Sequence, residues 1–217
     1  MQRIEAWAQT GALWLGAGLL LTTSLFHVGV EGSGSIVEAL GPIADAWLAI
    51  HIAQVVALGC IGVGVIHLSR DMHSIPAVLS RMFTLLYMFF YIAADAAAGI
   101  GTGIVLVLNN QVIALNDAMV SLDPTTVEGI LYSLLESKTT HAIFFAASAS
   151  WSLAVASLLF VLHKKGYSLW SEGPLFIAGG TFFFGHGPIL GVITALALLP
   201  VALEDTLRRL SERNGHN

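Results

Sequence analysis

Charged residues are scarce in this 217-residue chain, and cysteine is almost absent. Asp, Glu, Lys and Arg together make up 11% of the residues, whereas hydrophobic residues make up 56%. Soluble domains carry about 25% charged residues, so this composition excludes an ordinary soluble fold. The single cysteine, Cys60, cannot form an intrachain disulfide, and there is no C-x-x-C-H motif for covalent haem attachment. No run of Lys and Arg accompanies the net charge of -5, so we expect no nucleic acid partner.

Long apolar stretches are what the chain does contain. They cover residues 11–30, 47–68, 82–108, 139–162 and 174–203. A helix needs about 20 apolar residues to cross a bilayer, and only helices satisfy their backbone groups within one segment. The sequence therefore predicts an all-α, polytopic transmembrane helix bundle of five spans, forming one membrane domain over residues 1–217. The last stretch is overlong and contains Pro188 and Pro200, so six spans are the alternative.

The distribution of Lys and Arg predicts the orientation of the chain in the cell membrane. Short loops on one side of the predicted bundle hold Arg3, Arg70, Arg81, Lys164 and Lys165, and the two other loops hold only Lys138. Because positive charge collects on the cytoplasmic side, we expect a cytoplasmic N-terminus. In a five-span chain, Arg208, Arg209 and Arg213 would fall on the opposite side, against this tendency. The polar connection 109–138 would be external, with a short helix at 125–135.

Three histidines are predicted to share one layer of the membrane. At 1.5 Å of rise per residue, His27, His51 and His141 should lie within roughly 10 Å of the external boundary. Burial favours neutral imidazole, the form that binds metal. Such a triad could hold Cu or Zn, and any facing pair could supply the axial nitrogens of a b-type haem. The alternative is that each histidine binds no cofactor and bonds a neighbouring helix, since no ligand motif such as H-E-x-x-H is present.

A second layer is predicted near the midplane. Asp95 lies 13 residues from either end of its stretch, and His186 lies 12 residues beyond Pro174. Asp95 is part of an i, i+4 stripe, with polar residues before it and close-packing glycines after it, formed by Tyr87, Tyr91, Asp95, Gly99 and Gly103.

The segment around His186 should interrupt its helix. Gly185 and Gly187 flank His186, and Pro188 removes a backbone donor. Many transporters build ion sites at such breaks, so Asp95, His186 and Tyr91 are predicted to form a proton relay or ion site. An ordinary proline kink, with Asp95 and His186 paired for packing, is the alternative.

Two further histidines, His67 and His163, are predicted at the cytoplasmic boundary, with rings that reach the headgroups. His67 lies 16 residues after His51, which places the two about 160° apart around a helix. A single helix would therefore not present both to two stacked haems, so one outer cofactor is the better hypothesis.

Two segments carry a resemblance in layout to known proteins. HLSRDMHSIPAVLSR lies between the second and third stretches, and HAIFFAASASWSLAVASLLFVLHKKG covers the fourth stretch and its Lys-flanked turn. In these, the chain resembles uncharacterised bacterial integral membrane proteins of five to six helices. The resemblance implies a helix bundle and no activity, so no site residue is carried over from it.

Four hypotheses for function follow. The first is a small membrane redox protein or subunit that holds a haem or another His-bound metal near the external face and exchanges electrons with a quinone or another membrane subunit. The second is a proton- or ion-coupled carrier that uses Asp95 and His186. The third is a metal-dependent membrane enzyme using His27, His51 and His141, and the fourth an accessory subunit without cofactor. The sequence leaves open whether the protein is an enzyme.

Overall fold

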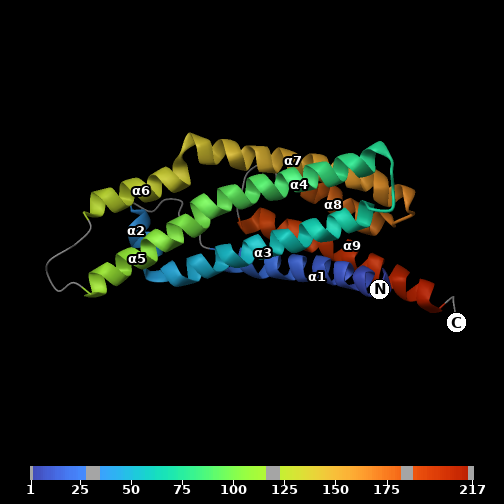
Figure 1. The fold of residues 1–217 in the computed structure, drawn as a ribbon, viewed down its shortest axis with the longest axis horizontal. Helices are drawn as coiled ribbons and strands as arrows, with labels where there is room; N and C mark the ends of the chain where they lie inside the picture. Colours follow the sequence, from blue (N-terminus) through green and yellow to red (C-terminus); the bar gives the residue numbers. More distant parts are fainter. Residues whose placement is uncertain (1, 28–34, 116–122, 182–187, 215–217) are drawn as a thin grey trace.

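The computed structural model describes residues 2–27, 35–115, 123–181 and 188–214, and these residues are almost entirely helical (Figure 1). The elements are α1 (Gln2–Phe26), α2 (Ile36–Leu40), the 3-10 turn η1 (Gly41–Ile43), α3 (Ala44–Ser69), α4 (Ile75–Asp95), the π-helical turn η2 (Ala96–Gly101), α5 (Thr102–Leu115), α6 (Pro124–Glu136), α7 (Lys138–Lys164), α8 (Leu169–Thr181) and α9 (Pro188–Asn214). The described ranges contain no β-strand, so the all-α prediction is confirmed.

Helix ends fall where the local sequence supplies caps. Ser137 starts α7, and its hydroxyl accepts a hydrogen bond from the Thr140 N–H. Asp123 caps α6 in the same way, followed by a proline at the first helical position. Gly166 ends α7 with a positive φ of 73°, which lets the Tyr167 N–H bond back to the Leu162 carbonyl at 3.0 Å. These ends are local and could be predicted from the chain.

The helices pack side by side along most of their length (Figure 1). α4 lies against α7, α1 lies against both α3 and α9, and α8 contacts α9 and α7. α1 and α3 approach closely at Gly16, where an added Cβ would lie 2.8 Å from the backbone nitrogen of Ile61. One buried cluster runs through this bundle and includes Leu58, Ile61, Trp151 and Leu198.

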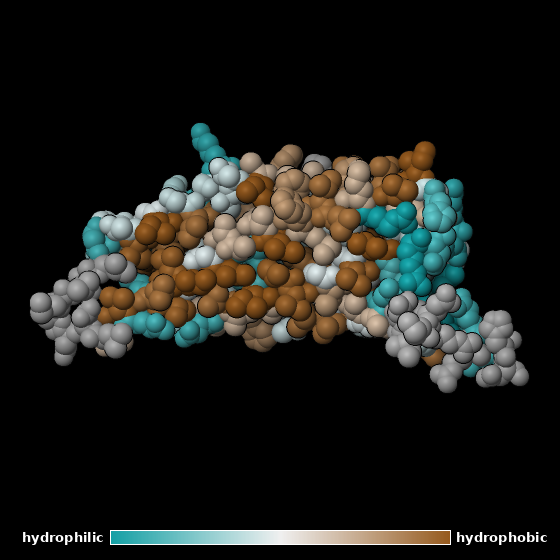
Figure 2. Space-filling view, in the orientation of Figure 1, coloured by the Kyte–Doolittle hydropathy of each residue, from teal (hydrophilic) through white to brown (hydrophobic). Residues whose placement is uncertain are grey.

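The middle of the molecule has a largely apolar surface, and one end is hydrophilic (Figure 2). Within the described residues, four helical stretches are long and apolar enough to cross a membrane: Ile36–Ser69, Ile75–Ala114, Pro124–Lys164 and Pro188–Glu212. The chain therefore has the character of a multi-pass membrane protein.

The last apolar stretch, predicted as one span over 174–203, requires a correction. It consists of two helices, α8 and α9, that pack on each other. Residues just before α8 bond to the far part of α9: the Tyr167 hydroxyl donates to Asp205 at 2.9 Å, and the Ser168 N–H to Glu204 at 3.0 Å. The stretch thus begins and ends at the same end of the bundle. Proline starts α9 because it cannot continue a preceding helix.

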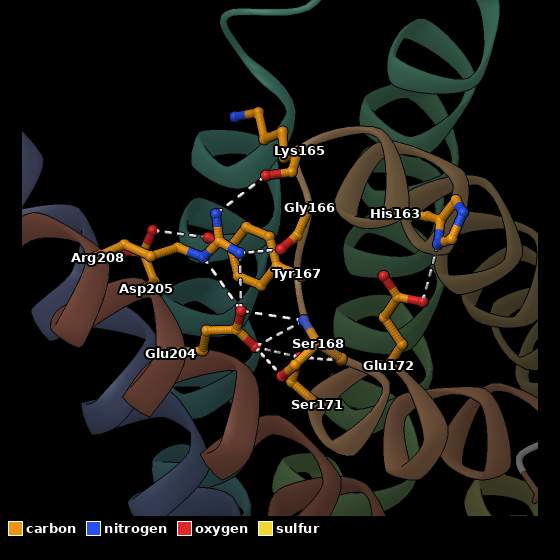
Figure 3. Close-up of polar contacts among 10 residues, drawn as sticks. All are labelled: His163, Lys165, Gly166, Tyr167, Ser168, Ser171, Glu172, Glu204, Asp205 and Arg208. Atoms are coloured by element: carbon orange, nitrogen blue, oxygen red, sulfur yellow. Dashed lines mark hydrogen bonds and ion pairs between the residues drawn. The ribbon is translucent and has the colours of Figure 1, made fainter.

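Hydrogen bonds hold the two ends of this α8–α9 hairpin together (Figure 3). Glu204 accepts from the hydroxyls of Ser168 at 2.6 Å and Ser171 at 2.7 Å, and from Arg208. The Arg208 guanidinium also lies 4.3 Å from the centroid of the Tyr167 ring. Burial, helped by the Asp205 carboxylate, raises the pKa of Tyr167, so its phenol remains a hydrogen-bond donor to that carboxylate.

Basic side chains gather at this end, which we call the basic end: Arg70, Arg81, Lys164, Lys165, Arg208 and Arg209. Arg70 donates to Gln9 at 3.0 Å, and Lys165 to the Leu68 carbonyl at 2.7 Å. Arg208 reaches the Lys165 carbonyl at 3.0 Å. The hairpin therefore returns Arg208 and Arg209 to the end that holds the other basic residues, rather than to the opposite side as five spans required.

A helical cap covers the opposite end of the bundle. The cap comprises α2, η1, the start of α3, α5 and α6, around a second buried cluster that includes Leu40, Trp47, Leu106 and Leu131. Glu128 of α6 accepts from the Ile36 N–H at 2.7 Å and so caps α2. In the connection predicted as an external loop over 109–138, α5 continues to Leu115 and α6 occupies the place of the predicted short helix.

Candidate functional site

A buried ion pair joins α3 to the end of α4. His51 Nδ1 lies 2.6 Å from Asp95 Oδ1, and the two side chains are only 4% and 1% exposed. Ionisable groups between apolar helices are costly and usually mark a site of function. His51 lies 18 residues before the end of α3, about 27 Å from the basic end, so the pair lies just beneath the cap.

The packing around His51 depends on Gly99. A Cβ at this position would lie 2.2 Å from His51 Nδ1 and 2.4 Å from its Cγ. Only glycine therefore lets the imidazole lie flat against the helix that carries Asp95. The Trp47 indole, one turn before His51, donates to the Gly99 carbonyl at 2.9 Å, and its ring centroid lies 4.5 Å from that of His51. The imidazole is thus held on two sides.

A π-helical turn, η2, begins directly after Asp95. Such turns are rare and frequent at functional sites, because the wider turn shifts side-chain directions and frees backbone groups from regular helix bonding. Here the turn contains Gly99, whose carbonyl bonds to a side chain of α3. The irregular backbone and the ion pair therefore form one unit.

A second histidine lies beside the pair. His27, directly after α1, has its ring centroid 5.1 Å from that of His51, edge-on, and 5.2 Å from that of Trp47. The structure thus brings together three residues that the sequence assigned to two separate layers: His27, His51 and Asp95. Asp95 lies level with His51 because the part of its helix beyond the π turn packs against the cap.

Polar atoms of the pair remain available for a further partner. His51 Nε2 and Asp95 Oδ2 are buried and have no hydrogen-bond partner among the described residues. At the basic end, by contrast, Glu204 accepts four kinds of donor, which is the pattern of a structural clamp. Unsatisfied buried polar atoms carry a free-energy penalty and call for a functional explanation. The His51–Asp95 pair is therefore the candidate site.

The remaining predicted site residues lie elsewhere. The His141 side chain is 61% exposed and lies 3.5 Å from Glu136, at the start of α7. Tyr91 is buried one turn before Asp95 and packs against Tyr87 and Phe144, with centroids 5.6 and 5.9 Å away. His186 lies outside the described residues, so the predicted pairing of Asp95 with His186 is not described. The described partner of Asp95 is His51.

The two boundary histidines differ from one another. His163 is 76% exposed and lies 3.5 Å from Glu172, in keeping with a ring near the headgroups. His67, however, is buried at the basic end and contacts Arg209 of α9. Packing of α9 on the bundle, which the five-span arrangement did not include, accounts for this burial.

The arrangement tests the predicted cofactors. Two axial imidazoles of a haem face each other across the porphyrin plane. The rings of His27 and His51 are in edge contact instead, so these two residues do not fit a haem between them. No group of three His, Cys, Asp or Glu side chains in the described ranges could hold a metal ion, because His141 does not join the other two. A two-histidine metal site at His27 and His51 is what the geometry leaves.

One signal for the pair was present in the sequence. Gly99 follows Asp95 by one helical turn on the same stripe, which predicts a close neighbour beside the carboxylate. The identity of that neighbour depends on how α3 crosses α4, and local sequence patterns do not determine a crossing.

No family model, curated protein or solved structure matches this chain. The functional argument therefore depends on the residues and contacts described above.

Proposed function

We propose that the protein is a proton carrier of the cell membrane, and that the His51–Asp95 pair takes up and releases the transported proton. The single observation that supports this most directly is a buried imidazole–carboxylate bond of 2.6 Å between membrane-type helices, with one polar atom on each partner left over. Intramembrane His and Asp residues are the usual elements of proton relays.

The charge balance of the pair favours proton uptake. With one exchangeable proton, the pair is neutral overall, either as imidazolium with carboxylate or as imidazole with carboxylic acid. Loss of that proton leaves a single negative charge in a buried environment, which is costly. The proton is therefore released only when the environment changes or a cation replaces it. This coupling of charge to surroundings is what a carrier needs.

Two features of the backbone support the same proposal. The π-helical turn after Asp95 is a site of irregular helix geometry next to the ionisable pair. The α8–α9 hairpin begins and ends at one end of the bundle, and α8, with 13 residues, is only about 20 Å long. Short or interrupted helices beside an ion site are typical of transporters, because they can shift relative to the rest of the bundle.

We further propose six membrane-embedded helices, with both termini in the cytoplasm. The helices are α1, α3, α4 with η2, α7, α8 and α9. In this orientation the six residues of the basic end face the cytoplasm, as the positive-inside tendency requires, and the cap faces outward. The proton-binding pair then lies near the external boundary, beneath the cap.

Proton flux into liposomes tests the proposal. The purified protein is reconstituted with pyranine inside, and a potassium diffusion potential set with valinomycin drives protons inward. We expect acidification faster than in protein-free liposomes, and Asp95→Asn should reduce the protein-dependent rate at least ~10-fold. Asp45→Asn is the matched control, because Asp45 is exposed at the start of α3. Flux equal to that of protein-free liposomes refutes the proposal.

The second candidate is a His-bound metal used in electron transfer, with a quinone or another membrane subunit as partner. One observation favours it: Asp95 holds Nδ1 of His51, as carboxylates do for metal-binding histidines, while Nε2 has no partner among the described residues and His27 lies beside the ring. An absorption spectrum and elemental analysis of the purified protein decide this point. A colourless, metal-free protein that conducts protons excludes this second candidate.

A further inference from the structure

Buried polar side chains line one face of α4 from the basic end to Asp95. They are Ser80, Thr84, Tyr87, Tyr91 and Asp95, all between 0% and 4% exposed. Their spacings of four, three, four and four residues place them on a single face of the helix. We call this face the hydroxyl stripe. Neighbouring residues on the other face, such as Leu85 and Phe89, are apolar and exposed.

This distribution is not what packing alone requires. A helix in a membrane bundle packs well through apolar or small residues, whereas each buried hydroxyl has to find a partner. Here the polar residues form a continuous row, about 22 Å long at 1.5 Å per residue. One end of the row lies next to Arg81, which bonds to the Ser69 carbonyl at 2.6 Å, and the other end is the candidate proton site.

Neighbouring helices add polar groups and aromatic walls to this row. Gln54 of α3, one turn beyond His51, and Ser148 of α7 are both buried. The Tyr87 ring packs against Trp151 of α7 at 4.9 Å between centroids, and this contact separates the stripe from lipid. The row therefore runs through the interior of the bundle, between α4, α7 and α3.

Several polar atoms along the row have no partner among the described residues. They include Ser80 Oγ, Gln54 Oε1 and Asp95 Oδ2. Buried polar atoms that the protein does not satisfy are commonly bonded by internal water. Hydroxyls on successive turns lie too far apart for direct contact unless a long side chain or a water molecule connects them. Tyrosine side chains are long enough to bridge part of each gap.

We infer that the hydroxyl stripe is the path by which protons move between the basic end and the His51–Asp95 pair. The inference depends on the proposed function and specifies its route. Each hydroxyl or water accepts a proton from one neighbour and gives one to the next, so no group along the path gains a net charge. The proton ends on the pair, which is the only member that keeps it. The Thr84 hydroxyl donates to the Ser80 carbonyl at 2.7 Å, and its O–H has to rotate to pass a proton on.

Substitutions at Thr84 separate a path from mere packing. Thr84→Val keeps the shape of the side chain and removes the hydroxyl, whereas Thr84→Ser keeps the hydroxyl and removes a methyl group. In the liposome assay, we expect Thr84→Val to slow proton flux ~10-fold and Thr84→Ser to retain more than half of the wild-type rate. A packing role gives the reverse order, since Ser leaves a cavity at this fully buried position and Val does not.

Tyr91→Phe is the second variant, and it should slow flux at least ~10-fold because it removes the hydroxyl nearest Asp95 along the stripe. Tyr132→Phe of α6, where the ring is 62% exposed, is the matched control. The melting temperature of each variant is measured in parallel, and wild-type melting with slow flux supports the path. If Asp95→Asn abolishes flux while Thr84→Val and Tyr91→Phe conduct normally, the path is refuted and the carrier proposal stands. If the wild type does not conduct, the carrier proposal itself fails.

Discussion

Replacing Gly99 by alanine is the most direct perturbation of the candidate site, because it changes no charge and removes no polar group. The new Cβ would lie 2.2 Å from His51 Nδ1, 2.4 Å from Cγ and 2.8 Å from Cε1. Ordinary contacts between such atoms are about 3.5 Å or longer, so the imidazole has to move by more than ~1 Å. A hydrogen bond that is 2.6 Å long does not survive a displacement of that size away from its partner.

The free-energy change follows from three contributions. Loss of a hydrogen bond to a charged group costs about 1.5–3 kcal/mol, and overpacking costs about 1–3 kcal/mol. The helix preference of alanine over glycine offsets about 1 kcal/mol. The net destabilisation is therefore roughly 2–5 kcal/mol, equivalent to a fall in melting temperature of roughly 4–20 °C for a chain of this size.

Thermal unfolding of the detergent-purified protein, followed by tryptophan fluorescence, measures this change. Gly59→Ala is the matched control, because Gly59 lies inside α3 and an added Cβ there meets nothing within 4 Å. We expect the control to melt at or above the wild-type temperature and to conduct protons normally, while Gly99→Ala melts lower and conducts poorly. A Gly99→Ala protein that matches the wild type in both measurements refutes the close packing of His51 and its role in conduction.

Two further predictions address the ends of the bundle. Glu204→Gln removes the charge of the basic-end clamp and should lower stability by about 1.5–3 kcal/mol while the folded protein conducts normally; Glu212→Gln, exposed on α9, is the control, and an unchanged melting temperature contradicts the clamp. Glu128→Ala removes the distant cap of α2 and should speed amide hydrogen exchange at Ile36 and Val37, by about 1 kcal/mol of opening free energy; Glu136→Ala is the control, and unchanged exchange would show that α2 does not depend on Glu128.

Much of the fold could be predicted from local pattern. Apolar stretches of sufficient length indicate membrane helices wherever they occur, and Ser137, Asp123 and Gly166 mark helix ends through bonds to their immediate neighbours. The i, i+4 stripe around Asp95 likewise predicts which face of α4 is buried. Each of these features depends on residues within a few turns of one another.

The last apolar stretch shows where local pattern is insufficient. Its length and composition suit one span as well as a hairpin, and the difference depends on contacts between Tyr167, Ser168, Glu204 and Asp205. Those residues are more than 30 positions apart, and no periodicity relates them. The basic residues Arg208 and Arg209 were the one sign in the sequence that five spans placed the C-terminal part on the wrong side.

The sequence by itself determined that this protein is an all-helical membrane protein with few, buried ionisable groups, because hydrophobicity and helical period are properties of contiguous residues. Only the tertiary structure decided which of those groups meet. His51 bonds to Asp95, with His27 beside it, and His141 remains exposed. The physical reason is that helix crossings and the position of a π turn arise from side-chain packing between distant segments, so a difference of one turn exchanges one partner for another.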